Sequence, residues 1–514
     1  MRFRWARRLV GQGRLEPAPK VPGLEHRFSI PDAFGRAPAL VAVARGRDHP
    51  LTYTNTAYAE VFGDGFPYLA DQSFVRLIED VNRSGEPCSA RAARVRLGDG
   101  RDGHFTFVCV PIRGRRRDVG GVLVVGVDVT DQVVTNELLR GSEERYRQAA
   151  ITLQRSLLPQ RLHEPDEVAV ATRYLPGGNE AEVGGDWYDV IPLGAGRTAF
   201  VIGDVMGRGL RAAAIMGQLR AAVRAYARLD LQPHEVLRLL DGLITEIGEP
   251  QIVTCVYAVF DPSDYTMNYS AAGHLPPLAI LETGKPAHRL EEASGPPLGV
   301  GGWPYVSETS HLEPGSTVAF YTDGLVERRG EDIGQGIDDL VAALEEFNGE
   351  PEGLADHVLR QMNLPTEHSD DTALLVMQVR EFTGDEAQVF RTAAVELMGG
   401  GEVATRARAF TTGVLASWRM PVELSERTVL AVSELVTNAL THGEPPVGLR
   451  LRRTRRRLIV EVRDRDEHLP RRRFAGLTDE TGRGIMIVST VAASWGSRKT
   501  EHGKAVWCEF PLSG

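Results

Sequence analysis

The sequence predicts a multidomain protein of the α+β class, in which separate small sheets are flanked by helices. The chain has 514 residues, more than one ordinary hydrophobic core organises, which indicates two to four domains. Short β-prone runs, among them 104–112 and 121–129, recur between glycine punctuation and helix-prone stretches. Hydrophobic residues make up 42% and charged residues 25%, which is ordinary for a globular protein.

The composition excludes several classes of protein. The 59 basic residues against 69 acidic ones give a net charge of −10, which argues against general nucleic-acid binding. The four cysteines form no CxxC pair, so neither a disulfide framework nor a zinc site is expected, and a reducing compartment fits. The N-terminus lacks the apolar core of a secretion signal, and no stretch approaches the ~20 apolar residues that span a bilayer. We therefore expect a cytoplasmic protein without a nucleic-acid or membrane partner.

Residues 22–130 predict a small α+β domain. A strand pair at 39–44 and 51–55 and a helix at 73–83 precede the two long β-prone runs. Four shorter stretches are YTNTAY at 53–58, FG at 62–63, SGEP at 84–87 and DVT at 128–130. Together with the layout they resemble a PAS sensor domain, which implies a domain that binds a ligand or mediates dimerisation. No residue in it indicates a particular cofactor.

Residues 131–160 predict a helical connector. Leu139, Tyr146 and Leu153 recur every seven residues, and two further apolar residues follow at the complementary four-residue offset. One expected core position is a glutamate, which weakens the pattern. The seam predicts either a short coiled coil that forms a homodimer or a single amphipathic helix packed on a neighbour.

Four acidic motifs between residues 161 and 380 are the most informative part of the chain. They are VGGDWYD at 183–189, VIGDVMGRG at 201–209, FYTDGLVE at 320–327 and SDDTALLV at 369–376. Each places an aspartate beside a β-prone run or a glycine, where backbone can approach a ligand closely. A single such aspartate is often only a helix cap. Four of them, far apart in the sequence, converge only through the fold.

Clustered carboxylates repel one another and desolvate badly unless a cation joins them. Hard divalent ions such as Mg²⁺ or Mn²⁺ accept oxygen ligands and remove this cost. Two such ions about 3.5–4 Å apart can share a carboxylate and present a hydroxide to a phosphorus atom. The motifs therefore predict hydrolysis of a phosphate ester without a covalent enzyme intermediate.

The order of these motifs supports a specific resemblance. Three further stretches contribute to it: LQRSLLP at 153–159, AAGHLPP at 271–277 and PPLGV at 296–300. The region resembles the metal-dependent type-2C serine/threonine phosphatases, in particular the bacterial stage II sporulation protein E branch. The resemblance implies an α/β/β/α sandwich over 161–380, with two Mn²⁺ or Mg²⁺ ions at one end of it.

The same resemblance implies roles for individual residues. The implied metal ligands are, in chain order, Asp186, Asp204, the Val205 carbonyl, Asp323 and Asp370, with Asp371 as an alternative to Asp370. Asp204 would bridge both ions, and Asp186, Asp204 and Asp323 would be the catalytic residues. His274 would either assist near the ions or serve as a turn residue bonded to backbone.

Residues 386–514 predict a further α+β domain. A helix ends in SELVTNALTHG at 433–443, where Glu434 and Asn438 lie four apart and face one side. Asparagine is unfavourable in mid-helix unless its amide has a role. A hairpin with an arginine-rich turn at 452–457, which we expect to be solvated or to dock an acidic partner, leads to Asp464. The stretch TGRGIMIV at 481–488 places glycines at a helix start, suited to phosphate.

These features resemble the anti-sigma-factor serine kinases of the histidine-kinase-like ATPase superfamily. The resemblance implies that ATP and Mg²⁺ bind, with Asn438 holding Mg²⁺ and Glu434 acting as general base. Asp464 would bind adenine, and Gly482 and Gly484 would line the phosphates. The glycines expected after Asp464 are missing, since the sequence continues RDEHLP. A nucleotide-free interaction module is therefore the alternative.

Together the resemblances imply a partner-switching regulator. The phosphatase would dephosphorylate a phosphoserine or phosphothreonine on an anti-sigma-factor antagonist protein. The C-terminal domain would phosphorylate a similar protein or bind a sigma factor. The alternative is a non-catalytic scaffold that sequesters regulators through degenerate catalytic domains.

Overall fold

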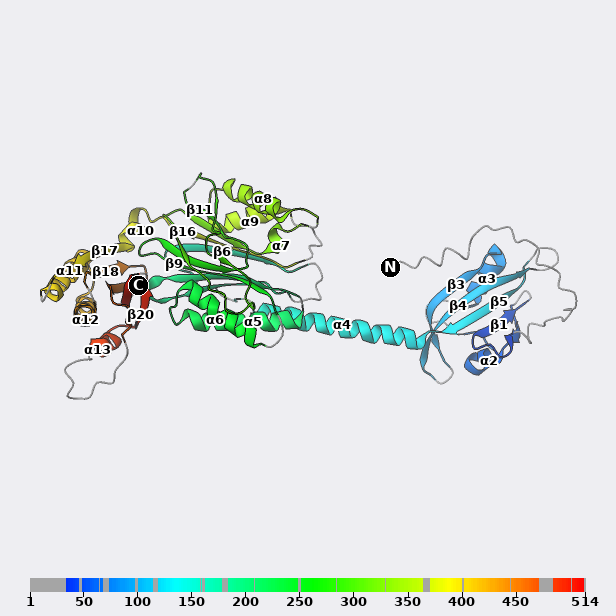
Figure 1. Cartoon of the computed structure of the whole chain (residues 1–514). Coiled ribbons are helices and arrows are strands. Elements are labelled where there is room, and N and C mark those ends of the chain that lie inside the picture. Colours follow the sequence, from blue (N-terminus) through cyan, green and yellow to red (C-terminus); the bar gives the residue numbers. More distant parts are fainter. Residues whose placement is uncertain are drawn as a thin grey trace. The chain divides into compact units, whose positions relative to one another are not determined.

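The computed structural model divides into two compact units, residues 1–143 and 144–514 (Figure 1). The described residues are 34–45, 49–63, 65–67, 74–97, 100–113, 119–157, 159, 162–177, 184–207, 209–247, 251–282, 284–328, 330–363, 370–399, 402–443, 445–470, 484–500 and 502–512. Residues 22–33 of the predicted first domain are outside this set. Among the described helices, none combines the length and the apolar character needed to cross a membrane.

The first unit contains an antiparallel sheet with the order β2-β1-β5-β4-β3. Its strands are β1 (Leu40–Ala44), β2 (Leu51–Thr54), β3 (Cys88–Arg96), β4 (Asp102–Arg113) and β5 (Val119–Asp128). Helices α2 (Thr56–Phe62) and α3 (Phe74–Ser84) cover one face and bury Tyr58 and Ile78 against Phe107. Asn55 caps α2 by accepting from Tyr58 N, and the same oxygen accepts from Val41 N at 3.0 Å. One asparagine thereby joins the first helix to the first strand.

Helix α4 (Thr130–Leu157) follows β5. Thr130 begins the helix beside β4, because its hydroxyl accepts a hydrogen bond from His104 N at 2.8 Å. Three apolar side chains of its first half, Val134, Leu138 and Leu139, are exposed. The predicted seam positions Tyr146 and Leu153 lie among residues whose side chains are outside the described set.

Two stacked sheets form the centre of the second unit. The first sheet has the order β13-β10-β9-β8-β7, with β14 also paired to β10, and the second has the order β12-β11-β15-β16-β6. The strands of the first are β7 (Trp187–Pro192), β8 (Thr198–Val205), β9 (Val253–Asp261), β10 (Thr266–Ala272), β13 (Ser294–Gly295) and β14 (Glu308–His311). Those of the second are β6 (Val168–Leu175), β11 (Leu278–Ile280), β12 (His288–Arg289), β15 (Thr317–Tyr321) and β16 (Thr372–Val379).

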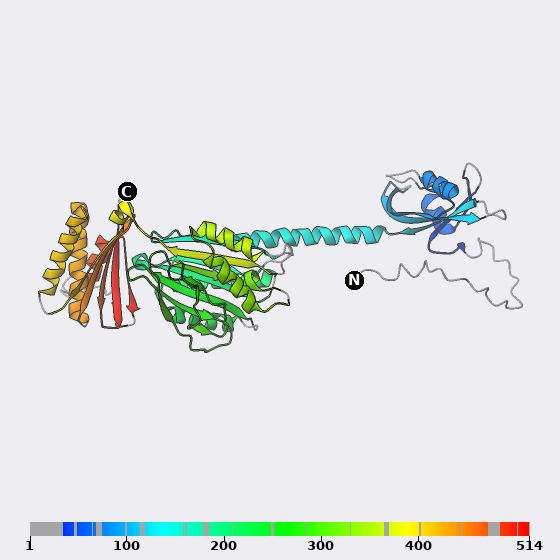
Figure 2. The same cartoon turned by 90° about the horizontal axis from the view of Figure 1, so that it is seen from above.

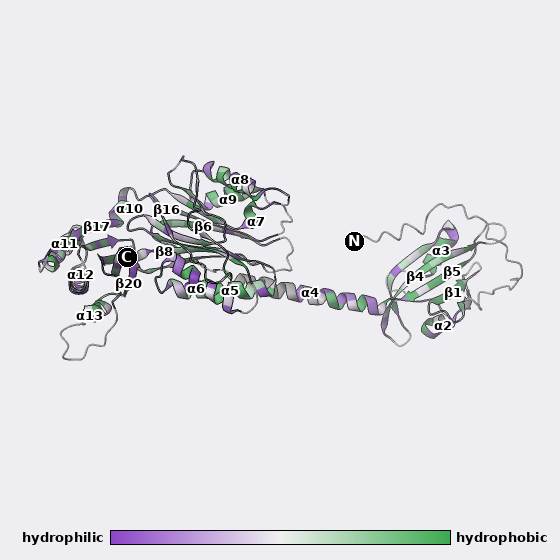
Figure 3. Cartoon of the chain, in the orientation of Figure 1, coloured by the Kyte–Doolittle hydropathy of each residue, from purple (hydrophilic) through white to green (hydrophobic). Residues whose placement is uncertain are grey.

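Helices cover both outer faces of this sandwich (Figure 1). On the first sheet lie α5 (Leu210–Ala227) and α6 (Pro233–Glu246), and on the second lie α7 (Asp323–Val326), α8 (Ile333–Glu345) and α9 (Pro351–Met362). Hydrophobic and hydrophilic residues both occur along α5 and α6, as expected for helices with one buried side (Figure 3). Between the sheets Phe200 stacks on Phe320 with ring centroids 6.0 Å apart. The predicted α/β/β/α sandwich is confirmed.

The remaining sheet has the order β17-β18-β19-β21-β20. Its strands are β17 (Arg391–Leu397), β18 (Val447–Arg453), β19 (Arg457–Asp464), β20 (Ser494–Thr500) and β21 (Gly503–Pro511). After the short helix α10 (Gly384–Val389), the helices are α11 (Val403–Ser417), α12 (Val422–His442) and α13 (Gly484–Val491). The yellow-to-orange pair α11 and α12 lies along one face of the sheet (Figure 2), where Leu435 packs with Val460 and Val462.

The arginine-rich turn between β18 and β19 is only partly solvated. Arg455 and Arg456 expose 63% and 69% of their side chains, as the sequence predicts. Arg452 is 6% exposed and lies beside Glu167 of the sandwich, so the expectation of solvent is wrong for this residue. Its surroundings are described below.

Candidate metal centre and nucleotide pocket

Three of the predicted aspartates converge at one end of the sandwich. Asp186 directly precedes β7 and Asp204 lies near the end of β8; since Trp187 pairs with Gly203, the two aspartates are neighbours across the hairpin. Asp323 begins α7, and one residue, Thr322, separates it from the end of β15 in the other sheet. Carboxylate oxygens of Asp186, Asp204 and Asp323 all lie within 4.8 Å of one another.

Two glycines of the VGGDWYD motif allow this close approach. A Cβ at Gly185 would lie 2.1 Å from the Val205 carbonyl oxygen, and one at Gly184 would lie 1.1 Å from Asp371 Oδ2. Neither contact is possible for a side chain, so only glycine fits the backbone between these groups. The same packing brings the Val205 carbonyl to the immediate neighbourhood of Asp186.

Thr322 orients the most buried aspartate of the group. Its hydroxyl donates to Asp186 Oδ2 at 2.7 Å and accepts from Ala373 N at 2.8 Å. A buried carboxylate with a fixed donor keeps its other oxygen directed to the remaining ligands. We did not predict Thr322, although it directly precedes Asp323 in the FYTDGLVE motif.

The three carboxylates are held in an environment that disfavours their charge. Burial, followed by the nearby charge of Asp204, raises the pKa of Asp186 well above its ordinary range. Burial and the charge of Asp323 raise the pKa of Asp204 to about 7, and burial and Asp370 raise the pKa of Asp323. A cation would remove this penalty. A set of carboxylate and carbonyl oxygens fits Mg²⁺ or Mn²⁺ rather than a thiophilic metal.

Asp370 and Asp371 occupy different environments. Asp370 is exposed and is not a member of the close group of three. Asp371 is 4% exposed and accepts hydrogen bonds from the Tyr174 hydroxyl and from Gly177 N. The geometry therefore leaves the choice between them open, with Asp371 built into the protein and Asp370 facing solvent.

His274 joins the two sheets beside the cluster. Its Nδ1 lies 2.7 Å from the Thr254 hydroxyl of β9, and its Nε2 lies 3.1 Å from the Tyr321 carbonyl oxygen of β15. Burial lowers the pKa of His274 to about 4, so the ring is neutral at pH 7. This arrangement matches a residue bonded to backbone more closely than a proton carrier.

A second group of predicted residues meets at the start of α13. A Cβ at Gly484 would lie 2.9 Å from Asn438 Nδ2 and 3.0 Å from Glu434 Oε2, so the glycine packs directly on both side chains. Gly482 lies outside the described residues. Asp464 is 5% exposed, and its Oδ1 lies 3.1 Å from Lys504 Nζ. No local sequence pattern predicts Lys504, because only the pairing of β19 with β21 brings it to Asp464.

Three segments of the chain match models of known families. Residues 34–134 match the PAS fold, 194–380 match Stage II sporulation protein E, and 401–510 match the histidine kinase-like ATPase domain. The predicted combination of these three domain types is confirmed.

Individual relatives cover parts of the chain. Phosphoserine phosphatase RsbU of Bacillus subtilis (strain 168) is 24% identical over 201 residues, which are 38% of this chain and 58% of the relative. Protein IcfG of Synechocystis sp. (strain ATCC 27184 / PCC 6803 / Kazusa) is 26% identical over 259 residues, 42% of this chain and 39% of the relative. The match thus spans less than two thirds of either relative.

One solved structure is similar to more of the chain. The crystal structure of the RsbU and RsbW domains of a Mycobacterium tuberculosis protein is 24% identical, covers 69% of this chain and 95% of that chain, and has a TM-score of 0.42.

The raised pKa of Asp204 predicts how pH affects the metal-free protein. Between the ordinary carboxyl pKa and about 7, the unfolded chain releases a proton that the folded protein keeps, so folding stability falls as pH rises. Asp204→Asn removes this titration. In EDTA we expect the variant to be more thermostable than the wild type at pH 8, with a gap that grows by at most about 2 kcal/mol from pH 5.5 to pH 8. Thermal unfolding measures it; a gap independent of pH, or the same gap in exposed Asp385→Asn, contradicts it.

Proposed function

We propose that the chain is a metal-dependent phosphatase that hydrolyses phosphoserine or phosphothreonine on a partner protein. The observation that carries the proposal is the meeting of Asp186, Asp204 and Asp323, from two different sheets, within 4.8 Å. These residues, the Val205 carbonyl, and Asp370 or Asp371 would hold two Mn²⁺ or Mg²⁺ ions. Bound ions of this kind neutralise phosphoryl oxygens and activate water for in-line attack.

The protein's own groups position that chemistry. Thr322 fixes one oxygen of Asp186, and the β7–β8 pairing fixes Asp204 beside it. His274 is neutral and spans both sheets, so it holds the two halves of the site together without adding charge. The similarity to RsbU of Bacillus subtilis, a phosphoserine phosphatase, supports the substrate class. An anti-sigma-factor antagonist is the phosphoprotein that we propose, in a cytoplasmic partner-switching pathway.

Replacing Asp204 tests the enzymatic proposal. Asp204→Ala should lower Mn²⁺-dependent hydrolysis of a phosphoserine protein at least about 100-fold. Even the loss of a residue that only supports a metal ligand costs about 10–100-fold, and Asp204 is a proposed ligand itself. Thr322→Ala should cost about 10–100-fold in Mn²⁺ affinity, and Thr322→Ser should restore it, since serine keeps the hydroxyl. Exposed Asp385→Ala is the matched control. Full activity in a folded Asp204→Ala protein would overturn the proposed metal mechanism, whereas an inactive wild type with Mn²⁺ would favour the non-catalytic scaffold.

We further propose that the C-terminal domain binds ATP and Mg²⁺. The packing of Gly484 on Glu434 and Asn438 supports it, because it places the N-terminus of α13, whose backbone amides suit a phosphate, beside these two side chains. Asn438 would hold Mg²⁺, Glu434 would be the general base of a serine kinase, and Gly482 would also line the phosphates. Asp464 would bind adenine while it shares its carboxylate with Lys504.

Ligand linkage tests ATP binding separately from catalysis. ATP with Mg²⁺ at 100 times its Kd should stabilise the domain by about 2.7 kcal/mol, seen as a rise in Tm of the full chain. Asn438→Ala should remove most of this rise. A wild-type Tm that is unchanged at millimolar ATP would favour an interaction module, for example one that binds a sigma factor.

We also propose a homodimer through the connector helix. The exposure of Val134, Leu138 and Leu139 on the first turns of α4 supports it, since a single helix gains nothing from an apolar side in water. Sedimentation should show a dimer for the wild type, and Leu138→Glu with Leu139→Glu should shift it to monomer. A monomeric wild type at micromolar concentration would contradict this proposal.

A further inference from the structure

The C-terminal sheet has a second face that is not covered by its own helices. Along β19, Val460 and Val462 point to the helical core, so Ile459, Glu461 and Arg463 point the other way. This outer face packs on the phosphatase sandwich within the same compact unit. The two domains therefore meet through a sheet surface and not only through a linker.

An apolar contact lies at the centre of this interface. The turn that joins β7 to β8 contains the one-turn 3-10 helix η1 (Gly194–Gly196), and Ala195 of this turn is buried with Ile459 and Trp507. A Cβ at Gly194 would lie 1.8 Å from Trp507 Cζ2. Because Gly194 has no side chain, the indole of Trp507 packs directly against the turn.

The turn has a backbone conformation that the neighbouring domain supports. Ala195 has φ +60°, a left-handed conformation that is unfavourable for a residue with a side chain. Its carbonyl accepts a hydrogen bond from Arg452 Nη2 at 2.9 Å in a buried environment. Gly196, at φ +71°, lies against the same guanidinium. Arg452 thus holds the turn from the opposite domain.

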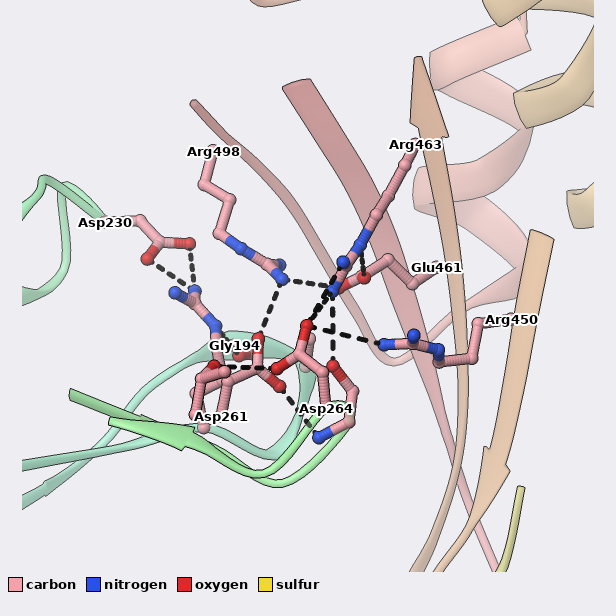
Figure 4. Close-up of polar contacts among 12 residues, drawn as sticks. Gly194, Asp230, Asp261, Asp264, Arg450, Glu461, Arg463 and Arg498 are labelled. Carbon is pink, nitrogen blue, oxygen red and sulfur yellow. Dashed lines mark hydrogen bonds and ion pairs between the residues drawn. The ribbon is translucent and has the colours of Figure 1, made fainter. Parts of the chain in front are cut away.

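Ion pairs also join the two domains (Figure 4). Arg498 Nη2 lies 3.1 Å from Asp261 and 2.7 Å from Glu461, and Arg463 lies 3.2 Å from Asp264. Burial opposes the charge of Asp261, but Arg498, Arg197 and Arg452 outweigh it and lower its pKa. The carboxylates of Asp261 and Asp264 come from the sandwich and the guanidinium groups of Arg463 and Arg498 from the C-terminal sheet, so separating the domains would break these charge pairs.

The turn at 193–197 is connected to the candidate metal centre by the two strands that it joins. Strands β7 and β8 pair without interruption from Pro192 and Thr198, beside the turn, to Trp187 and Gly203, beside Asp186 and Asp204. The turn at 193–197 and the two proposed metal ligands therefore lie at opposite ends of one hairpin. On the other side of the interface, β19 carries Glu461 and Arg463 and ends at Asp464, the proposed adenine-binding residue.

We propose that the C-terminal domain is an intramolecular partner of the phosphatase, and that its sheet, by seating the turn at 193–197, positions the metal ligands Asp186 and Asp204. Displacement of the sheet from the turn lowers metal affinity at the other end of the hairpin. The proposal rests on the proposed metal centre but not on its catalytic activity. Gly194, Arg452 and Trp507 act as positioning residues.

One methyl group tests the proposal in the full-length chain. Gly194→Ala introduces a Cβ that collides with Trp507. The φ of Gly194 is not left-handed, so alanine does not strain the backbone there. Gly242→Ala in α6 is the matched control, because a Cβ there meets nothing within 4 Å. Arg452→Gln removes the support of Ala195 from the opposite side and serves as a second, independent variant.

Two measurements read out the result without enzyme activity. Hydrogen exchange should become faster at 193–197 in both variants, and calorimetry should show Mn²⁺ binding weakened by about 5–150-fold, the usual range for coupled sites. The Gly242→Ala protein should match the wild type in both. Faster exchange with Mn²⁺ affinity within twofold of wild type would overturn the proposal, as would unchanged exchange at the turn. If the wild type shows no phosphatase activity but Gly194→Ala and Arg452→Gln still weaken Mn²⁺ binding, the result supports this inference and contradicts only the phosphatase proposal.

Discussion

The candidate metal centre of the second unit is built around one constraint: three carboxylates lie close together in a mostly buried environment. Asp186, Asp204 and Asp323 approach within 4.8 Å, and burial raises the pKa of each. A fold gains nothing from such a cluster by itself, because repulsion and desolvation add. The surrounding architecture supplies what the cluster needs: two glycines that admit it, Thr322 that orients it, and a hydrophobic sandwich that fixes the strand ends from which it projects. The arrangement makes sense when a divalent cation completes it.

The sequence predicts those parts of the fold and site that depend on local pattern. Asp186, Asp204 and Asp323 are recognisable because each stands beside glycine or at the end of an apolar run, and Gly484 because it starts a helix. Glu434 and Asn438 are recognisable because four residues return a helix to the same side.

Features that depend on long-range packing are not recognisable in the same way. Lys504 reaches Asp464 only through the register of β21 against β19, which no local pattern records. Arg452 looks like its solvated neighbours in an arginine-rich turn, yet it is buried because a second domain covers it. Thr322 is a polar residue in a motif dominated by its aspartate. In each case the partner, not the residue itself, determines the role.

The packing of the β7–β8 turn against the C-terminal sheet also determines which faces of the C-terminal domain other molecules can reach. Its outer sheet face is occupied by the phosphatase, whereas the helical side carries exposed apolar residues, Val422 and Leu430 on α12 and Met486 on α13. A protein that docks on that helical side therefore does not compete with the sandwich for space. The C-terminal domain thus has two separate faces, one packed on the sandwich and one that exposes apolar side chains.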